Sequence, residues 1–450
     1  MEILSSGQKI RKIRKDLKFN QKEITGGEIT RELISMIEND KSTLTPAVAQ
    51  IIADNINRIC KEKNIDFSLD AEYLLEDIDS QTDKIASKYI DFLSINEDNI
   101  SKDFYKNIEE IELFLIKYDV PKKKMIIYEK IGDIFKNQDE FNKSYIYYIK
   151  AFENHNGLFN DSRLFSILQK LGCICIYLEK NKEALDFNNL ALMYNYNIPK
   201  DLRFKVLHNN TLAYMNLEEY NKALLEIEHV ENTFETLTKK NIFDFNVLKA
   251  HCFRYKKFYN DALKTNEFIL SILDNDDTEN IILINSNILD IYTELKDIKN
   301  IKVYIDKLIY LMNNYAEVKE SYYFPNAYNQ LGFSANLVNN VEISIEYYKK
   351  SIETARSQRN KRVLLMSLDQ LLDVLIKEKN IEEINSFKNQ IIEMISLDIV
   401  KTGIPAIFKL MVFYNDIGGN ESLNSLLQFI LDSKKDQIYS ENNPEMFQTN

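Results

Sequence analysis

The residue types that most often carry catalysis or bind metal ions are few and scattered in this chain. The histidines are His155, His208, His229 and His251, and the cysteines are Cys60, Cys173, Cys175 and Cys252. Two cysteines that are two positions apart on a helix point about 200° away from each other, so they cannot hold one metal ion together. The sequence also lacks HExxH, Walker, GxGxxG and GxSxG motifs. We therefore expect no enzyme activity, metal or cofactor, and we interpret the cysteines as packing residues.

Charge is distributed unevenly and indicates where a polyanion could bind. Residues 1–63 contain 12 Lys and Arg against 9 Asp and Glu, whereas the whole chain has a net charge of −12. A basic end on an acidic protein is expected when only that end meets phosphate groups. Nucleic acid is therefore a candidate partner for the first 63 residues.

Composition favours an all-α fold. The 450 residues include only 10 Gly and 6 Pro, and 45% are hydrophobic. Few turn-forming residues and enough apolar residues for a core suit long helices that are joined by short loops. No apolar signal segment opens the chain, and no run of about 18 apolar residues follows. We therefore expect a cytoplasmic protein that does not contact a membrane.

Four short helices are expected in residues 1–63. Ile10, Ile13 and Leu17 form one apolar stripe on the first helix. Asn20 and Thr30 can cap the second and third helices, and Pro46 suits the first turn of the fourth. The intervening segment Thr25-Gly26-Gly27 predicts a turn.

Two segments of this region resemble Cro/repressor-like (XRE-type) helix-turn-helix domains. They are Gly7-x-x-Ile10-Arg11-x-x-Arg14 and the third helix from Ile29 to Lys41, which is similar to the family pattern I-S-x-I-E-x-G-K. Asp40 stands where the family often has glycine, so we expect the turn after the third helix to differ. The resemblance implies that the third helix enters the major groove of DNA. The DNA-binding residues that it implies are Arg11, Lys15, Gln21, Thr30, Arg31, Glu32, Ser35, Asn39 and Lys41.

A charged segment, residues 64–81, follows the helix-turn-helix region. It lacks Gly and Pro and contains Phe67, Leu69, Tyr73 and Leu74. We predict a partly helical linker that can transmit motion. Residues 82–432 are predicted to form a repeat domain of eight to nine units, the ninth being a divergent helical pair in residues 82–118. Residues 433–450 are predicted to be a disordered tail.

One pattern of apolar, small and aromatic residues recurs eight times at intervals of 39 to 43 residues. We call the recurring position, which is often glycine, the anchor; the anchors are Gly132, Gly172, Thr211, Ala250, Leu289, Gly332, Leu372 and Met411. Another small or apolar residue lies twelve positions after each anchor: Ser144, Ala184, Ala223, Ala262, Ile301, Ser344, Ile384 and Leu423. A fixed repeat of this length predicts stacked helical hairpins.

The units resemble tetratricopeptide repeats, most closely at Tyr128-x-x-Ile131-Gly132-x-x-Phe135 and at Leu168-x-x-Leu171-Gly172. This resemblance implies a right-handed α-solenoid whose first helices line a concave groove. The peptide-binding residues that it implies are Gln169, His208, Asn209, His251, Arg254, Asn287, Asp290, Asn326, Asn329 and Asn336. Asparagine amides match the donors and acceptors of an extended peptide backbone.

The order of the two regions resembles the RRNPP group of Gram-positive peptide-pheromone receptors (Rap, Rgg, NprR, PlcR and PrgX). That resemblance implies a cytoplasmic homodimer that binds double-stranded promoter DNA at a two-fold site and a short signalling peptide in quorum sensing. Two alternatives stay open: the repeats bind a protein such as a response regulator, or they only dimerise. Substitution of Asn209 or Asn329 is expected to separate these readings by abolishing the response and leaving the fold intact.

Overall fold

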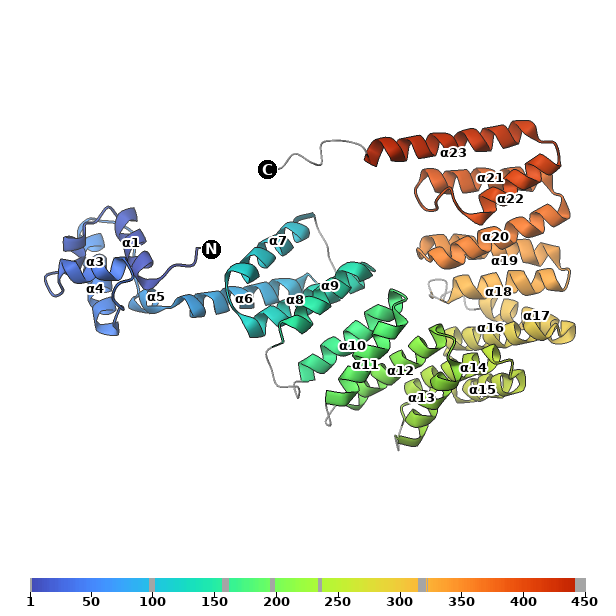
Figure 1. Ribbon diagram of the computed structural model, residues 1–450, viewed down its shortest axis with the longest axis horizontal. Helices are drawn as coiled ribbons and strands as arrows, with labels where there is room; N and C mark the ends of the chain where they lie inside the picture. Colours follow the sequence, from blue (N-terminus) through green and yellow to red (C-terminus); the bar gives the residue numbers. More distant parts are fainter. Residues whose placement is uncertain are drawn as a thin grey trace. The chain divides into compact units, whose positions relative to one another are not determined.

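The computed structural model describes residues 2–96, 102–155, 162–194, 199–233, 237–314, 321 and 323–441. Every regular element in these ranges is a helix, which confirms the all-α expectation (Figure 1). The chain divides into two compact units, Met1–Glu219 and Tyr220–Asn450, and each is described by itself. No helix within the described ranges is long and apolar enough to cross a membrane.

The first unit begins with a five-helix head. Its helices are α1 (Ser6–Asp16), α2 (Gln21–Thr25), α3 (Arg31–Glu38), α4 (Pro46–Glu62) and α5 (Ala71–Leu75). The side chains of Ser5, Asn20, Thr30 and Thr45 each accept a hydrogen bond from a backbone N–H in the first turn of the helix that follows. These bonds satisfy amides that have no partner inside the helix, and so they fix where each helix begins.

The apolar core of the head extends beyond the predicted limit at residue 63. Ile10, Ile34 and Ile52 are fully buried at its centre. Leu69 and Leu74 belong to the same cluster, so α5 packs on the helix-turn-helix region. Part of the segment that was predicted as a linker is therefore structurally part of the head.

The turn after α3 keeps the left-handed conformation, and the expectation that it would differ is wrong. Asp40 itself has a φ of 53°, and its Oδ1 accepts a hydrogen bond of 2.7 Å from Ser5 Oγ. Asp is one of the few residues other than Gly that visit this conformation routinely, because its short side chain can bond locally.

A buried lysine binds the end of the head just before the first helix of the repeats, α6 (Ile78–Ile95). Lys9 Nζ donates to the carbonyls of Tyr73 at 2.7 Å and Glu76 at 2.8 Å, at the end of α5. On α6, Gln81 Nε2 donates to the carbonyls of Leu4, at 2.9 Å, and Glu76, at 3.1 Å. We call these contacts the joint.

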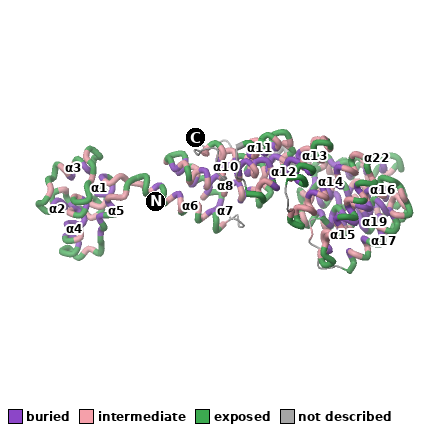
Figure 2. The backbone as a smooth tube through the Cα atoms, turned by 90° about the horizontal axis from the view of Figure 1, so that it is seen from below, coloured by how far each residue is buried: buried purple, intermediate pink, exposed green. Residues whose placement is uncertain are grey.

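The repeats continue through both units. In the first unit they comprise α6, α7 (Lys102–Lys117), α8 (Pro121–Asn137), α9 (Phe141–Glu153), α10 (Ser162–Tyr177), α11 (Asn181–Tyr194) and α12 (Lys200–Asn216). In the second unit they comprise α13 (Tyr220–Thr233), α14 (Lys239–Tyr255), α15 (Tyr259–Ile272), α16 (Thr278–Leu295), α17 (Ile298–Asn314), α18 (Phe324–Leu337), α19 (Val341–Ser357), α20 (Lys361–Glu378), α21 (Ile381–Ser396), α22 (Pro405–Asp416) and α23 (Asn420–Glu441). Figure 2 shows buried residues on the helices of the head and of both sets of repeats.

Close packing at the anchors explains the constant spacing. A Cβ atom added to Gly132 would lie 2.5 Å from the Tyr148 ring, and one added to Gly332 would lie 2.8 Å from the Tyr348 ring. Only glycine lets an aromatic side chain of the second helix approach the first helix so closely. Twelve residues after the anchor, Ser144 Oγ donates to the Gly132 carbonyl at 2.8 Å, and the Ser344 hydroxyl repeats this bond at Gly332.

The turn between the two helices of each repeat contains one left-handed residue, always seven positions after the anchor. These residues are Asp139, Glu179, Glu218, Lys257, Lys296, Asn339, Lys379 and Gly418. Seven of the eight carry side chains, so the chain forms identical short turns with little glycine. The low glycine content is therefore compatible with many hairpins.

The predicted disordered tail begins later than expected. Helix α23 runs from Asn420 to Glu441, so residues 433–441 are helical and that part of the prediction is wrong. The rest of the predicted tail, residues 442–450, lies outside the described residues.

Candidate functional sites

The residues predicted to bind DNA are distributed over α1, α2, α3 and the turns on either side of α3. Seven are exposed: Arg11, Lys15, Thr30, Arg31, Glu32, Asn39 and Lys41. The other two, Gln21 and Ser35, are partly buried. Thr30 Oγ1 accepts from the Leu33 backbone N–H at 3.2 Å, so this side chain caps α3. Asn39 Nδ2 donates to the Ser35 carbonyl at 2.7 Å, which leaves its carbonyl oxygen as an acceptor.

A buried ion pair orients α3 within the head. Glu38 accepts two bonds from the Arg14 guanidinium, at 2.6 Å and 2.8 Å, and one of 2.9 Å from Gln21 Nε2. Burial opposes ionisation of Glu38, but the bonds from Arg14 and Gln21 outweigh it and hold its pKa below the usual range. The network continues outward, because Gln21 Oε1 accepts from Arg31 Nε at 3.5 Å. Gln21 therefore helps to position Arg31.

Met36 is a candidate DNA contact that the sequence analysis missed. Its side chain is 46% exposed on α3, one helical turn after Glu32. An exposed apolar side chain on such a helix can contact the methyl group of thymine. The helical spacing from Glu32 was visible in the sequence, but apolar character suggested the core.

A second candidate site lies in the second unit, where four first helices line one groove. The groove is a cavity of about 650 Å³, lined by side chains of α14, α16, α18 and α20 and by Tyr323 and Asn360 just before α18 and α20. It brings together six of the residues predicted to bind peptide: His251, Arg254, Asn287, Asp290, Asn326 and Asn329. Asn336 lies on α18 but does not line the cavity, and Gln169, His208 and Asn209 belong to the first unit.

Three charged residues of the groove form a cluster in which Arg254 and Asp290 are partly buried and Glu294 is exposed. Arg254 donates from its terminal guanidinium to Asp290 Oδ2 at 2.5 Å and from Nε to Glu294 Oε1 at 2.8 Å. Burial raises the pKa of Asp290 to about 6, and Arg254 limits this rise. Burial, reinforced by Arg254, lowers the pKa of His251 to about 4. At neutral pH, His251 is therefore uncharged and Asp290 is mostly ionised.

Asn329 and Asn209 are more buried than ligand-contact residues should be. Asn329 is 4% exposed, and its Nδ2 donates to Ser367 Oγ and Gln370 Oε1, both at 2.8 Å. These bonds connect α18 to α20. Asn209 is 6% exposed within the first unit. The expectation that substituting these residues leaves the fold intact is therefore not supported at Asn329, whose amide holds two helices together.

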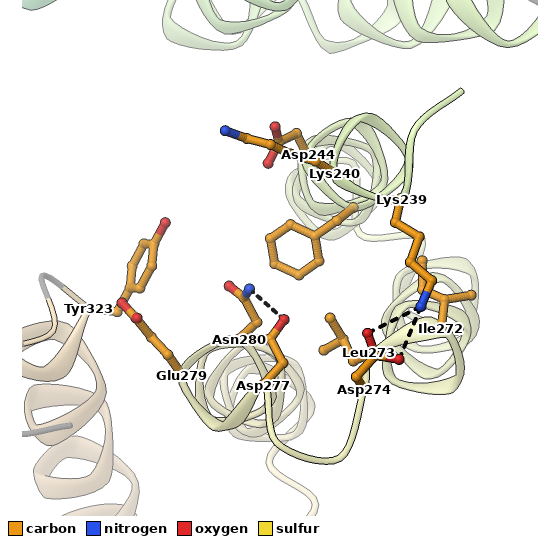
Figure 3. A pocket seen from close by; sticks show the side chains of 11 residues that line it. Lys239, Lys240, Asp244, Ile272, Leu273, Asp274, Asp277, Glu279, Asn280 and Tyr323 are labelled. Atoms are coloured by element: carbon orange, nitrogen blue, oxygen red, sulfur yellow. Dashed lines mark hydrogen bonds and ion pairs between the residues drawn. The ribbon is translucent and has the colours of Figure 1, made fainter. Parts of the chain in front are cut away.

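A smaller cavity of about 460 Å³ lies at the amino-terminal ends of α14 and α16 (Figure 3). Lys239 Nζ donates to both carboxylate oxygens of Asp274, at 3.0 Å and 3.1 Å, and Asn280 Nδ2 donates to Asp277 at 3.0 Å. Tyr323 lines this cavity and also the groove, so the two adjoin. Within the described ranges, no group of three or more His, Cys, Asp or Glu residues could hold a metal ion.

The cysteines are placed as packing residues. Cys60, Cys175 and Cys252 are buried, and Cys173 is partly buried. Burial raises the pKa of Cys175 to about 12 and that of Cys252 to about 11. A thiol with such a pKa is protonated at neutral pH and is a poor nucleophile.

Comparison with protein families supports the assignment of the head. Residues 7–77 match the family model of a helix-turn-helix domain. This match includes α5, as the apolar core does. No curated protein matches the chain.

Among solved structures, the apo form of the quorum sensor NprR from B. thuringiensis is 15% identical, with a TM-score of 0.50 over 85% of this chain and 99% of that one. A STAND protein with a tetratricopeptide repeat sensor from Pyrococcus horikoshii is 15% identical, with a TM-score of 0.48 over 76% of this chain. This chain spans only 55% of that protein. PlcR from Bacillus thuringiensis, in complex with the peptide PapR7 and DNA, is 12% identical with a TM-score of 0.28 over 60% of this chain and 99% of that one. At this identity the likeness to NprR shows the fold: a helix-turn-helix head followed by tetratricopeptide-like repeats.

Proposed function

We propose that this protein is a cytoplasmic transcription regulator of the RRNPP type, which binds promoter DNA through its head and a short signalling peptide through its groove. The observation that carries the proposal is the groove, which gathers polar side chains from four consecutive first helices in a chain that also has a helix-turn-helix domain. The likeness to a quorum sensor of the same fold supports it. A homodimer on a two-fold DNA site is part of the proposal, because helix-turn-helix dimers bind paired half-sites.

The groove suits a peptide more than a small apolar molecule. Its lining includes amides that have donors and acceptors on one group, such as Asn287 and Asn326. An extended peptide offers N–H and C=O groups along its whole length, so it can satisfy several helices at once. A ligand that spans several helices can favour one spacing of those helices over another, which is the differential affinity that a switch requires.

The joint supports transmission from repeats to head. Lys9 and Gln81 connect α1, α5 and α6 through bonds to backbone carbonyls. Through these bonds, a change in the repeats would act on the head and alter the distance between the two heads of a dimer. DNA affinity would then depend on the peptide.

The test uses full-length protein from its native host. Mass spectrometry of co-purifying small molecules is expected to identify a peptide of about five to ten residues. Adding that peptide back at about 100 times its Kd should stabilise the protein by about 2.7 kcal/mol. It should also change the affinity for the protein's own promoter in a mobility-shift assay.

A matched pair of variants localises the effect. Asn326→Ala removes an exposed amide from the groove, and Asn313→Ala removes an exposed amide from α17, outside it. Only Asn326→Ala should reduce the stabilisation by the peptide. A protein that is purified without any peptide and whose promoter binding depends on another protein would contradict the proposal and support the protein-partner alternative.

A further inference from the structure

The two ends of the groove differ in charge. At the end formed by α14 and α16, one guanidinium faces two carboxylates, those of Asp290 and Glu294, which leaves one excess negative charge at neutral pH. At the α20 end, Arg362 lines the cavity, is exposed and forms no ion pair with another described residue. It occupies the second position of α20, where the helix dipole adds positive potential.

Polar groups without partners lie between these ends. Ser286 lines the cavity and is nine-tenths buried, and its hydroxyl has no hydrogen-bond partner among the described residues. The Nδ2 atom of the neighbouring Asn287 is buried without a partner. Buried polar groups in folded proteins are almost always paired. The groove floor is therefore short of hydrogen bonds that a polar ligand would supply.

We propose that the groove binds a linear peptide with both ends unblocked and in one direction, with its ammonium group at Asp290 and Glu294 and its terminal carboxylate at Arg362. This inference rests on the proposed peptide-binding function. The opposite charges at the two ends attract the peptide in this direction and repel the reverse one. Apolar side chains near the carboxyl end can pack on Phe333 and Met366, which are exposed in the same cavity.

The distance between the two ends sets the length of the peptide. Asp290 lies one residue after its anchor, Leu289, and Arg362 lies ten residues before its anchor, Leu372. On parallel first helices with aligned anchors, this difference in position corresponds to roughly 16 Å along the helix axis. Two steps between packed helices, from α16 to α18 and to α20, add roughly 18 Å across them. The diagonal is about 24 Å, which an extended chain spans with about seven residues.

The experiment uses the full chain and four synthetic libraries of random heptapeptides: with both ends free, acetylated at the amino end, amidated at the carboxyl end, or blocked at both. Bound peptides are recovered by size exclusion and quantified by mass spectrometry. The library with free ends is expected to be enriched at least tenfold over each blocked library. Arg362→Ala should remove the preference for a free carboxylate, and Glu294→Gln should weaken the preference for a free ammonium group.

Lys361→Ala is the matched control, because Lys361 is also a cation in the first turn of α20 but does not line the groove. It should keep both preferences, and thermal melting should confirm that all variants are folded. Equal recovery from all four libraries would overturn the inference and leave peptide binding intact. Recovery from none of them would overturn the proposed function itself.

Discussion

Replacement of Glu38 by Gln tests whether the buried ion pair holds the DNA-binding helix in place. The side chains of Glu38 and Arg14 are only 3% and 14% exposed. Removing one partner of a buried pair costs roughly 3–5 kcal/mol, because the other charge stays buried. Arg14 keeps a bond of 3.1 Å to the Phe19 carbonyl and some contact with water, so we expect the lower end, about 3 kcal/mol.

Hydrogen exchange of the full chain, read by mass spectrometry, measures this loss locally. An opening equilibrium that is about 3 kcal/mol more favourable exposes amides roughly 100-fold more often. We expect that acceleration in peptides from α1 and α3 and none in the repeats. Glu32→Gln is the control, because Glu32 is exposed on the same helix. If both variants exchange at the same rate in α3, the ion pair does not hold the head and the reasoning is refuted.

The same pair predicts a dependence on pH. The folded-state pKa of Glu38 is lowered, so its contribution to stability is present above the unfolded pKa of about 4.3 and is lost as pH falls through the folded value. After correction for intrinsic rates, protection of α3 should be constant from pH 7 to pH 5 and should decrease below about 4.3. In Glu38→Gln, the protection of α3 should not decrease in this pH range. An equal decrease in the variant would mean that another group, and not Glu38, causes it.

Three further substitutions test the repeats, the head and the joint. Gly332→Ala should destabilise the protein by roughly 1–3 kcal/mol in urea melts, because its Cβ would overlap the Tyr348 ring, whereas Gly403→Ala, which meets no atom within 4 Å, should be nearly neutral. If Met36 contacts the methyl group of one operator thymine, Met36→Ala should weaken binding to that operator. On an operator in which this thymine is replaced by deoxyuridine, which lacks the methyl group, Met36→Ala and the unsubstituted protein should bind equally well. Lys9→Met should leave DNA binding of the free protein within twofold but reduce its response to peptide, both measured by fluorescence anisotropy.

The features that could be predicted from sequence are those that depend on local packing. The anchors could be located because a small or apolar residue recurs at intervals of 39 to 43 residues and another follows twelve positions later. At Gly132 and Gly332 the reason is visible, since each meets a tyrosine ring and accepts a bond from a serine of the second helix. The helix caps at Asn20 and Thr30 could be predicted equally well, because each side chain bonds a backbone N–H only three positions away. Six groove residues came together because first helices in a regular stack present the same positions to one side.

The features that were missed depend on contacts between distant parts of the chain. Lys9 looks like one more cation on a basic helix, and only the end of α5, more than 60 residues away, makes it a buried donor. Asn329 was assigned to the groove by its position, but Ser367 and Gln370, on the next first helix, bind its amide. Leu74 joins the head for the same reason, since nothing nearby in the sequence marks where its partners lie.

Several groove residues also fasten neighbouring repeats to one another, which would couple the proposed ligand binding to the packing of these helices. Polar contacts of groove residues link the first helices in series: Arg254 to Asp290, Thr293 to Ser334 and Asn329 to Ser367. In the proposed complex, a peptide ammonium group would share the carboxylates of Asp290 and Glu294 with Arg254, which binds one oxygen of each and links α14 to α16. Because such bonds are directional, a small change of partner shifts the spacing of two helices instead of being absorbed by apolar packing. The polar groups that line the proposed peptide site therefore include groups that hold neighbouring helices together.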